Sequence, residues 1–218
     1  MRLLLLRHGQ TTSNVAGALD TGRPGAALTD LGWAQARAAG RVLQEEGIEG
    51  VFVSSLLRTH QTAEPYVTGV GATQIEYDGL REIDAGDHEM KTDAESVQHY
   101  LSTVSNWIVG QHTHRMAGGE TGEEFLARYD ECIDAVVASG TDNAVVVSHG
   151  AAIRTWVGAR VIGTDDPRWE KHAFTPLHNT GGIHLERTPR GWEILDWSSD
   201  PIGGHYLDDP TAPDPTGR

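Results

Sequence analysis

The chain has 218 residues, one cysteine and a formal net charge of −14, with 17 basic against 31 acidic side chains. This charge disfavours binding to nucleic acid or to an anionic membrane surface, and the single cysteine excludes an internal disulfide and a thiolate metal cage. The apolar run at 3–6 is too short for a signal-peptide core or a membrane span, so we expect a cytoplasmic protein folded as one domain.

The first half of the chain alternates strand-like and helix-like segments. Residues 2–6 form an apolar run bounded by charge, which is typical of a strand buried on both faces. Residues 28–47 predict a helix, because Thr29 suits its N-cap, apolar side chains recur at helical spacing and Gly47 ends the pattern. The segments that follow are a strand at 50–55, a helix at 57–69 and a short strand at 73–77.

The second half continues this alternation and closes with a hairpin. Helical periodicity predicts helices over 93–110 and 119–140. The apolar run at 143–150 predicts a buried strand that leads into a helix at 151–163. Residues 181–198 are typical of two strands joined by a turn at TPRG. This order of elements predicts an α/β layer architecture.

The last residues, 206–218, are rich in proline and aspartate. The stretch 208–218 holds three prolines and three aspartates but no large apolar side chain, a composition typical of disorder. We therefore expect a single domain over 1–205 followed by a disordered tail.

Polar side chains follow three of the predicted strands at the point where each strand ends. Arg7 and His8 follow the first strand. Arg58 lies shortly after the second strand, and His149 ends the strand at 143–150. The carboxyl ends of parallel strands share one edge of a sheet, where ligands bind, so we expect these four side chains to converge. Two arginines and two histidines favour a phosphoryl group, because the arginine fork binds two oxygens at once.

Seven segments of the chain, in order, resemble the signature blocks of the histidine phosphatase superfamily, which includes the cofactor-dependent phosphoglycerate mutases. The segments are LLLLRHGQTTSN (3–14), LTDLGWAQA (28–36), SSLLRTHQTAEP (54–65), LREIDAGDHE (80–89), GGETGEEF (118–125), VVVSHG (145–150) and, more loosely, HNTGGIHLE (178–186). The resemblance implies a phosphoglycerate mutase-like fold, a three-layer α/β sandwich with a mostly parallel central sheet flanked by helices.

The resemblance implies a role for five residues that match the family's motifs. His8 would be the nucleophile, which attacks phosphorus and forms a phosphohistidine. Arg7, Arg58 and His149 would bind the phosphoryl oxygens and stabilise charge in the transition state. Glu82 would protonate the leaving oxygen and then activate water. The reaction implied in this way uses no metal ion and no cofactor.

Opposite protonation states suit His8 and Glu82. An imidazole must be neutral to attack, and neighbouring arginines disfavour its protonation, so we expect a lowered pKa for His8. Glu82 has to carry a proton when the ester bond breaks, which burial or a nearby carboxylate such as Asp84 or Glu89 favours.

Five further positions are candidates for substrate contact. Gln10 and Asn14 fall on positions of the first block near the phosphate, and Asn14 is expected to make the more direct contact. Thr21 and Arg23 lie in the loop after the first strand. Gly150 follows the second histidine of the cluster, where a glycine allows a ligand to approach the backbone closely.

The segment 84–118 follows Glu82, and relatives place a variable segment over the pocket at this point, so we expect a lid there. The block around Glu82 carries His88 where an aromatic residue is common in mutases, and Met90 where a glycine is common. These departures favour a phosphatase of a small phosphorylated metabolite over a cofactor-dependent phosphoglycerate mutase. The complete catalytic set argues against the third alternative, a non-catalytic interaction module of the same fold.

A metal hydrolase is an alternative of a different class, since the chain holds 11 histidines. The segment HEMKT (88–92) begins like the zinc-binding motif H-E-x-x-H, but Thr92 stands where the second histidine must be. We therefore expect no metal site, and no nucleic-acid or membrane partner. Relatives form monomers, dimers or tetramers, and of these states we predict a homodimer.

Overall fold

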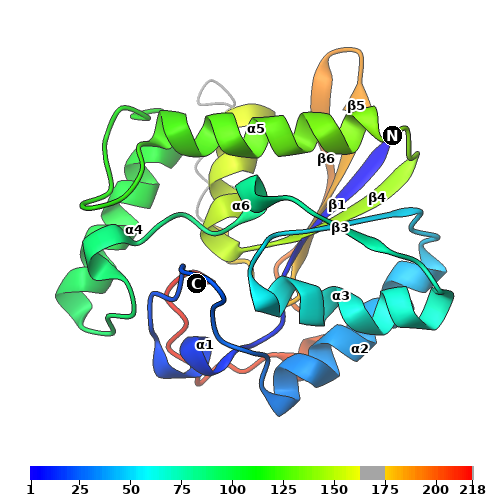
Figure 1. The fold of residues 1–218 in the computed structure, drawn as a ribbon, viewed down its shortest axis with the longest axis horizontal. Helices are drawn as coiled ribbons and strands as arrows, with labels where there is room; N and C mark the ends of the chain where they lie inside the picture. Colours follow the sequence, from blue (N-terminus) through cyan, green and yellow to red (C-terminus); the bar gives the residue numbers. More distant parts are fainter. Residues whose placement is uncertain (163–174, 218) are drawn as a thin grey trace.

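The computed structural model describes residues 1–162 and 175–217. Within these residues, one sheet lies between two sets of helices (Figure 1). The strands are β1 (Arg2–Arg7), β2 (Gly50–Val53), β3 (Gln74–Glu76), β4 (Asn143–Ser148), β5 (Gly182–Thr188) and β6 (Gly191–Ser198). The α-helices are α1 (Thr12–Ala16), α2 (Asp30–Glu45), α3 (Leu57–Val70), α4 (Ala94–Ile108), α5 (Gly122–Ala138) and α6 (Gly150–Val157). Short helical turns cover Asp78–Leu80, Gly86–His88, Gly158–Ile162 and His205–Leu207.

The sheet has the strand order β3-β2-β4-β1-β5-β6. Strands β3, β2, β4 and β1 run parallel, whereas β5 pairs antiparallel with β1, and β6 antiparallel with β5. This mostly parallel sheet confirms the predicted α/β class. Arg7 of β1 pairs in register with Ser148 of β4. The residues that follow these two strands, His8 and His149, therefore start side by side at one edge of the sheet.

Helices cover both faces of the parallel strands, which makes the fold a three-layer sandwich (Figure 1). Leu3 and Leu5 of β1 pack in a core cluster with residues of α4, α5 and α6. Leu4 and Leu6 point to the other face and pack against α2 and α3. Each of the four is at most 1% exposed, and burying such a side chain stabilises the fold by about 2 kcal/mol. The unbroken apolar run of β1 thus reflects burial on both faces.

The predicted helices and strands are confirmed with small shifts in their bounds. Thr29 caps the first turn of α2, and the helix ends shortly before Gly47, which adopts a φ of 67°. The helix predicted over 151–163 gives way to a π-helical turn after Val157, and its predicted end at 163 lies outside the described residues. Helix α1 is not predicted, because five residues are too few for a periodic pattern. In the part of the chain that the structure describes, no helix is long and apolar enough to cross a membrane.

The C-terminal residues 208–217 do not form the disordered tail that their composition predicts. They lie beside α1 at the carboxyl edge of the sheet (Figure 1), and Asp214 is buried there, with 6% exposed. Asp214 forms an ion pair with Arg7. A prediction from composition weighs apolar content, so it does not detect a segment held by a buried pair of charges.

Candidate active site

His8 and His149 lie at the carboxyl edge of the sheet, directly after β1 and β4. Their ring centroids are 5.2 Å apart, and both residues are buried. His8 Nδ1 lies 2.8 Å from the carbonyl oxygen of Gly9. Because a carbonyl oxygen only accepts, Nδ1 carries the hydrogen and the lone pair is on Nε2. Nε2 is therefore the atom of His8 that can act as a nucleophile.

Burial and nearby positive charge keep both imidazoles neutral. The pKa of His8 lies well below its ordinary value, first because the ring is buried and then because the Arg58 and Arg7 guanidiniums repel a proton. The pKa of His149 is lowered first by burial and then by the charge of Arg58. A neutral imidazole is the form that attacks, and this environment agrees with the expectation for His8.

We expect His8 to stay neutral at pH 6, where an imidazole with the ordinary pKa of about 6.5 is mostly protonated. Since its pKa is lowered in the folded state, the unfolded chain takes up this proton first. Through His8, the free energy of unfolding should fall as the pH drops below about 6.5, and should not change above it. An NMR titration of labelled imidazoles measures this pKa directly.

The unfolded chain and the variant Arg58→Gln serve as controls for the His8 titration. The urea-unfolded chain should show the ordinary histidine pKa, and Arg58→Gln should raise the pKa of His8 because one repelling charge is removed. A folded protein in which His8 titrates at its ordinary pKa would contradict a buried, neutral nucleophile.

Four buried nitrogen atoms near His8 have no hydrogen-bond partner within residues 1–162 and 175–217. They are Arg7 Nε, Arg58 Nε and Nη1, and His149 Nδ1. Buried polar groups are nearly always hydrogen-bonded, so such a group of unpaired donors is rare. Three of the four nitrogens belong to charged guanidiniums, which pair best with a negatively charged group that carries several oxygens. We propose that these four nitrogens form an anion site near His8.

Ser54, directly after β2, orients His149. Its Oγ lies 2.7 Å from His149 Nε2 and 3.2 Å from Thr59 Oγ1. Thr59 donates its hydroxyl hydrogen to the backbone carbonyls of Ser54 and Leu56, so the single hydroxyl hydrogen of Ser54 serves either Thr59 Oγ1 or His149 Nε2. In the tautomer in which Ser54 donates to Nε2, the hydrogen of His149 is on Nδ1, which has no partner among the described residues. In the sequence, Ser54 is only a polar residue at a strand end. Its contact with His149 is seen only in the folded structure.

Arg58 is held in place by Asp20. Arg58 Nη2 donates to the backbone oxygen of Asp20 at 2.9 Å, and Nη1 lies 3.8 Å from the Asp20 carboxylate. Both side chains are buried. With one end of the guanidinium fixed in this way, its Nε and Nη1 make no hydrogen bond among the described residues. No sequence pattern points to Asp20, because its contact with Arg58 spans 38 positions.

Glu82 is buried at the N-terminus of α6. Its carboxylate accepts hydrogen bonds from the backbone N–H groups of Ala151 at 3.2 Å and Ala152 at 2.8 Å, and from that of the next residue along the chain. The helix N-terminus therefore holds the side chain of Glu82 close to the point where His149 enters α6. The two carboxylates expected as its neighbours bond elsewhere: Asp84 accepts from Gly86 N, and Glu89 accepts from the backbone after Asp20.

Gly150 is the first residue of α6 and lies against Arg7. A Cβ at this position would come 3.0 Å from Arg7 Nε and 2.5 Å from the carbonyl oxygen of Thr216. Any larger residue would displace one of these groups, so the lack of a side chain leaves room for the Arg7 guanidinium beside α6.

Gln10 and Asn14, two of the predicted substrate contacts, face the C-terminal segment. Gln10 Nε2 donates to Asp209 Oδ2 at 2.9 Å. Asn14 Nδ2 donates to Asp214 Oδ1 at 3.0 Å. Both residues are buried. Their amides thus hold the segment 208–217 against the site, a contact that no motif in the sequence indicates.

Thr21 and Arg23, the other two predicted contacts, line a cavity of about 360 Å³. The remaining lining residues are Gly22, Asp78, Arg81 and Asp84. Arg23 pairs with Asp78, which also pairs with Arg81. One of the lining residues, Arg81, directly precedes Glu82 in the chain. The structure thus places Thr21 and Arg23 in a polar cavity of mixed charge.

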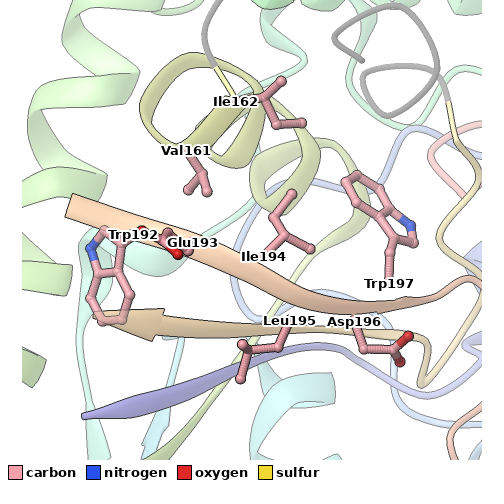
Figure 2. A pocket seen from close by; sticks show the side chains of 8 residues that line it. All are labelled: Val161, Ile162, Trp192, Glu193, Ile194, Leu195, Asp196 and Trp197. Atoms are coloured by element: carbon pink, nitrogen blue, oxygen red, sulfur yellow. The ribbon is translucent and has the colours of Figure 1, made fainter. Parts of the chain in front are cut away.

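A second cavity, of about 610 Å³, lies along β6 at the edge of the sheet (Figure 2). It is lined by Trp192–Trp197 of β6 and by Val161 and Ile162 of the turn after α6. None of the residues predicted for the site lines it. This cavity therefore takes no part in the site predicted from the sequence.

Comparisons of sequence and structure place this chain among known proteins. The family model of the histidine phosphatase superfamily (branch 1) matches residues 3–200. Putative phosphoserine phosphatase 2 of Hydrogenobacter thermophilus is 28% identical over 85% of this chain and 90% of its own length. PE-PGRS family protein PE_PGRS11 of Mycobacterium tuberculosis is 31% identical over 95% of this chain, which spans 38% of that protein. A mycobacterial glucosyl-3-phosphoglycerate phosphatase in complex with VO3 aligns with a TM-score of 0.76 and 26% identity, covering 90% of this chain and 98% of that one.

Proposed function

The chain belongs to the histidine phosphatase superfamily (branch 1) and is a phosphatase, and we propose that it hydrolyses a small phosphomonoester through a phosphorylated His8. One observation carries the mechanism: the unpaired buried donors of Arg7, Arg58 and His149 lie near a neutral histidine whose lone pair is on Nε2. This arrangement suits a phosphoryl group, which needs a nucleophile and several positive donors for its oxygens.

In the first step, His8 Nε2 attacks phosphorus, so an N–P bond forms while the bond from phosphorus to the ester oxygen breaks. The donors of Arg58, Arg7 and His149 stabilise the charge on the remaining phosphoryl oxygens. Glu82 gives its proton to the leaving oxygen, which departs as an alcohol. The phosphohistidine retains the phosphoryl group.

In the second step, water attacks phosphorus and Glu82 takes up the proton that water loses. The N–P bond breaks, its electron pair returns to His8 Nε2, and inorganic phosphate is released. Because Glu82 is bonded to the first turn of α6, which begins directly after His149, the acid and the phosphate-binding histidine keep one relative position in both steps.

For the leaving group, we assign the cavity lined by Thr21, Arg23 and Arg81. Its two arginines and two aspartates favour an alcohol that carries hydroxyl or ionised groups over an apolar one. The names of the relatives, a phosphoserine phosphatase and a glucosyl-3-phosphoglycerate phosphatase, both denote polar phosphomonoesters.

The proposed activity is tested by incubating the purified protein with a panel of phosphorylated metabolites and measuring phosphate release. We expect release to be fastest for polar esters and to continue in excess EDTA, since no step of the mechanism uses a metal ion. A parallel preparation of His8→Asn controls for contaminating phosphatases. Loss of activity in EDTA, or equal release by both preparations, would contradict the proposal.

Two alternatives are separated by the same assay. Isomerised rather than hydrolysed phosphoglycerate, dependent on 2,3-bisphosphoglycerate, would indicate a mutase. A protein with no turnover on any ester would indicate an interaction module. The lid over 84–118, the single domain over 1–205, the cytoplasmic location, the homodimer and the lack of nucleic-acid partners stay predictions from the sequence.

A further inference from the structure

Arg7 is bonded at both terminal nitrogens, mainly by the C-terminal segment 208–217. Its Nη1 lies 2.7 Å from Asp214 Oδ2 and its Nη2 lies 2.9 Å from Asp214 Oδ1, so the carboxylate is bound by both terminal nitrogens. Nη1 also donates to the backbone oxygen of Leu177 at 2.9 Å, and Nη2 to Thr216 Oγ1 at 3.1 Å. Three of these contacts are hydrogen bonds and the fourth, from Nη1 to Asp214 Oδ2, is an ion pair, so both terminal nitrogens are engaged. The third nitrogen, Nε, is buried and unpaired among the described residues.

We propose that Asp214 is a positioning residue, which binds Arg7 end-on so that Nε–H is held toward the phosphoryl group at His8. A guanidinium is planar, and a bidentate carboxylate fixes both the direction and the rotation of that plane. With the terminal nitrogens occupied, Nε is the atom left for a phosphoryl oxygen. This inference rests on the proposed function, because Arg7 has this task only if a phosphoryl group binds beside it.

Asp214 itself sits in a site built for a charged carboxylate. Burial raises its pKa, but the charge of Arg7 and hydrogen bonds from Arg7 and Asn14 outweigh this, so the pKa lies below its ordinary value. Asn14 Nδ2 donates to the same oxygen, Oδ1, that accepts from Arg7 Nη2. The carboxylate is thus ionised and held from two directions.

The backbone on both sides of Asp214 is packed closely around the ion pair of Arg7 and Asp214. Leu177 N donates to Gly217 O at 3.0 Å, and Arg154 Nη2 donates to Thr216 O at 2.9 Å. A Cβ at position 217 would overlap both Arg7 Nη1 and the Asp214 carboxylate, so only glycine allows this close approach. The segment lies beyond residue 200, where the match to the family model ends. The support for Arg7 is therefore a feature of this chain outside the matched part.

The geometry distinguishes positioning from self-inhibition. A carboxylate that blocked the site would satisfy the donors meant for phosphate. Here the unpaired donors remain Arg7 Nε, Arg58 Nε and Nη1, and His149 Nδ1, while Asp214 binds only the opposite end of Arg7. Removing Asp214 should therefore slow the enzyme, whereas removing an inhibitor would speed it up.

The test is the rate of Asp214→Ala with an ester that the wild-type protein hydrolyses. We expect kcat to fall about 10- to 100-fold with a smaller change in KM, because a contact displaced by about 1 Å has an effect of this size on the transition state. Asp214→Glu should recover part of the rate. Asp208→Asn is the matched control: it alters a carboxylate of the same segment that pairs with His178, and its kcat should equal that of the wild type.

A double-mutant cycle shows whether the effect passes through Arg7. In an Arg7→Lys background, which lacks the planar fork, Asp214→Ala should cost much less than in the wild type. If Asp214→Ala fails to fold, Gly217→Ala disturbs the same pair from the backbone and should show the same loss of kcat. Additive losses in the cycle would overturn the proposal.

Two other outcomes would also overturn it: a higher kcat/KM in Asp214→Ala, which indicates self-inhibition, or an unchanged kcat with a lower melting temperature, which indicates a structural pair only. Calorimetric binding of orthovanadate provides a readout without turnover, and Asp214→Ala should weaken it about 10-fold. If the wild type binds vanadate but hydrolyses no ester, the proposed function fails while the positioning role is still measured. If the wild type is active and Asp214→Ala matches it in both assays, the positioning role fails alone.

Discussion

Replacing His8 with alanine should lower kcat/KM for phosphate release on the order of 10⁵-fold, because the attack on phosphorus then has no nucleophile. The ring is buried between Gly9 and His149, and its free Nε2 is the atom that receives the phosphoryl group in our mechanism. The direct measurement is a denaturing quench of the enzyme during turnover of a ³²P-labelled ester. The wild type should retain acid-labile label, and His8→Ala should retain none.

His184→Gln is a suitable control for His8→Ala. His184 lies on β5 and bonds to Glu46, so it belongs to a different part of the sheet. This variant should keep both the rate and the label. Circular dichroism and the melting temperature of His8→Ala establish that its fold is intact. A folded His8→Ala protein that hydrolyses esters at the wild-type rate would refute the phosphohistidine mechanism.

Replacing Glu82 with glutamine should slow hydrolysis of alkyl phosphates by about 10²- to 10⁴-fold, the range typical of a lost general acid. An alkoxide is a poor leaving group and needs a proton as the ester bond breaks. A nitrophenolate leaves without one, so 4-nitrophenyl phosphate should lose far less rate in its first step. The ratio of kcat/KM for the two esters, in wild type and variant, measures the role of Glu82.

The stability of Glu82→Gln must be measured together with its kinetics. The carboxylate accepts from the N–H groups of Ala151 and Ala152, and a glutamine has only one oxygen to accept while its NH₂ group faces donors. Some loss of unfolding free energy is therefore expected. That loss affects both esters equally, whereas loss of the acid does not. Equal slowing of the alkyl and the aryl ester would argue against the role of Glu82 as the acid.

The strands of the sheet, and the meeting of the residues that follow them, could be predicted from the sequence. Strand β1 can be predicted from its apolar run because both of its faces are buried. The residues after β1 and β4 must meet because those strands are parallel neighbours. The side chains of Arg7, His8 and His149 then follow from the position at which each strand ends.

Contacts between distant segments could not be predicted in this way. Ser54 bonds to His149 across 95 positions, and Asp214 bonds to Arg7 across 207. The stretch around Asp214 holds few apolar groups, and it is held by polar contacts to Arg7, Gln10, Asn14 and Arg154 that have no periodic signal in the sequence. The polar partners of a catalytic residue thus require the folded structure, even where the residue itself stands in a recognisable motif.

The cavity lined by Thr21, Arg23 and Arg81 is formed by a different kind of structural element than the anion site. Thr21–Arg23 and Asp78–Asp84 belong to connecting segments, whereas His8 and His149 are attached to paired strands of the sheet. Substitutions in the connecting segments can change which alcohol is accepted without moving the groups that act on phosphorus. We expect that descendants of this chain can evolve to accept different substrates while they keep the same reaction at phosphorus. A mutant library confined to the cavity residues is therefore the efficient route to a new substrate specificity.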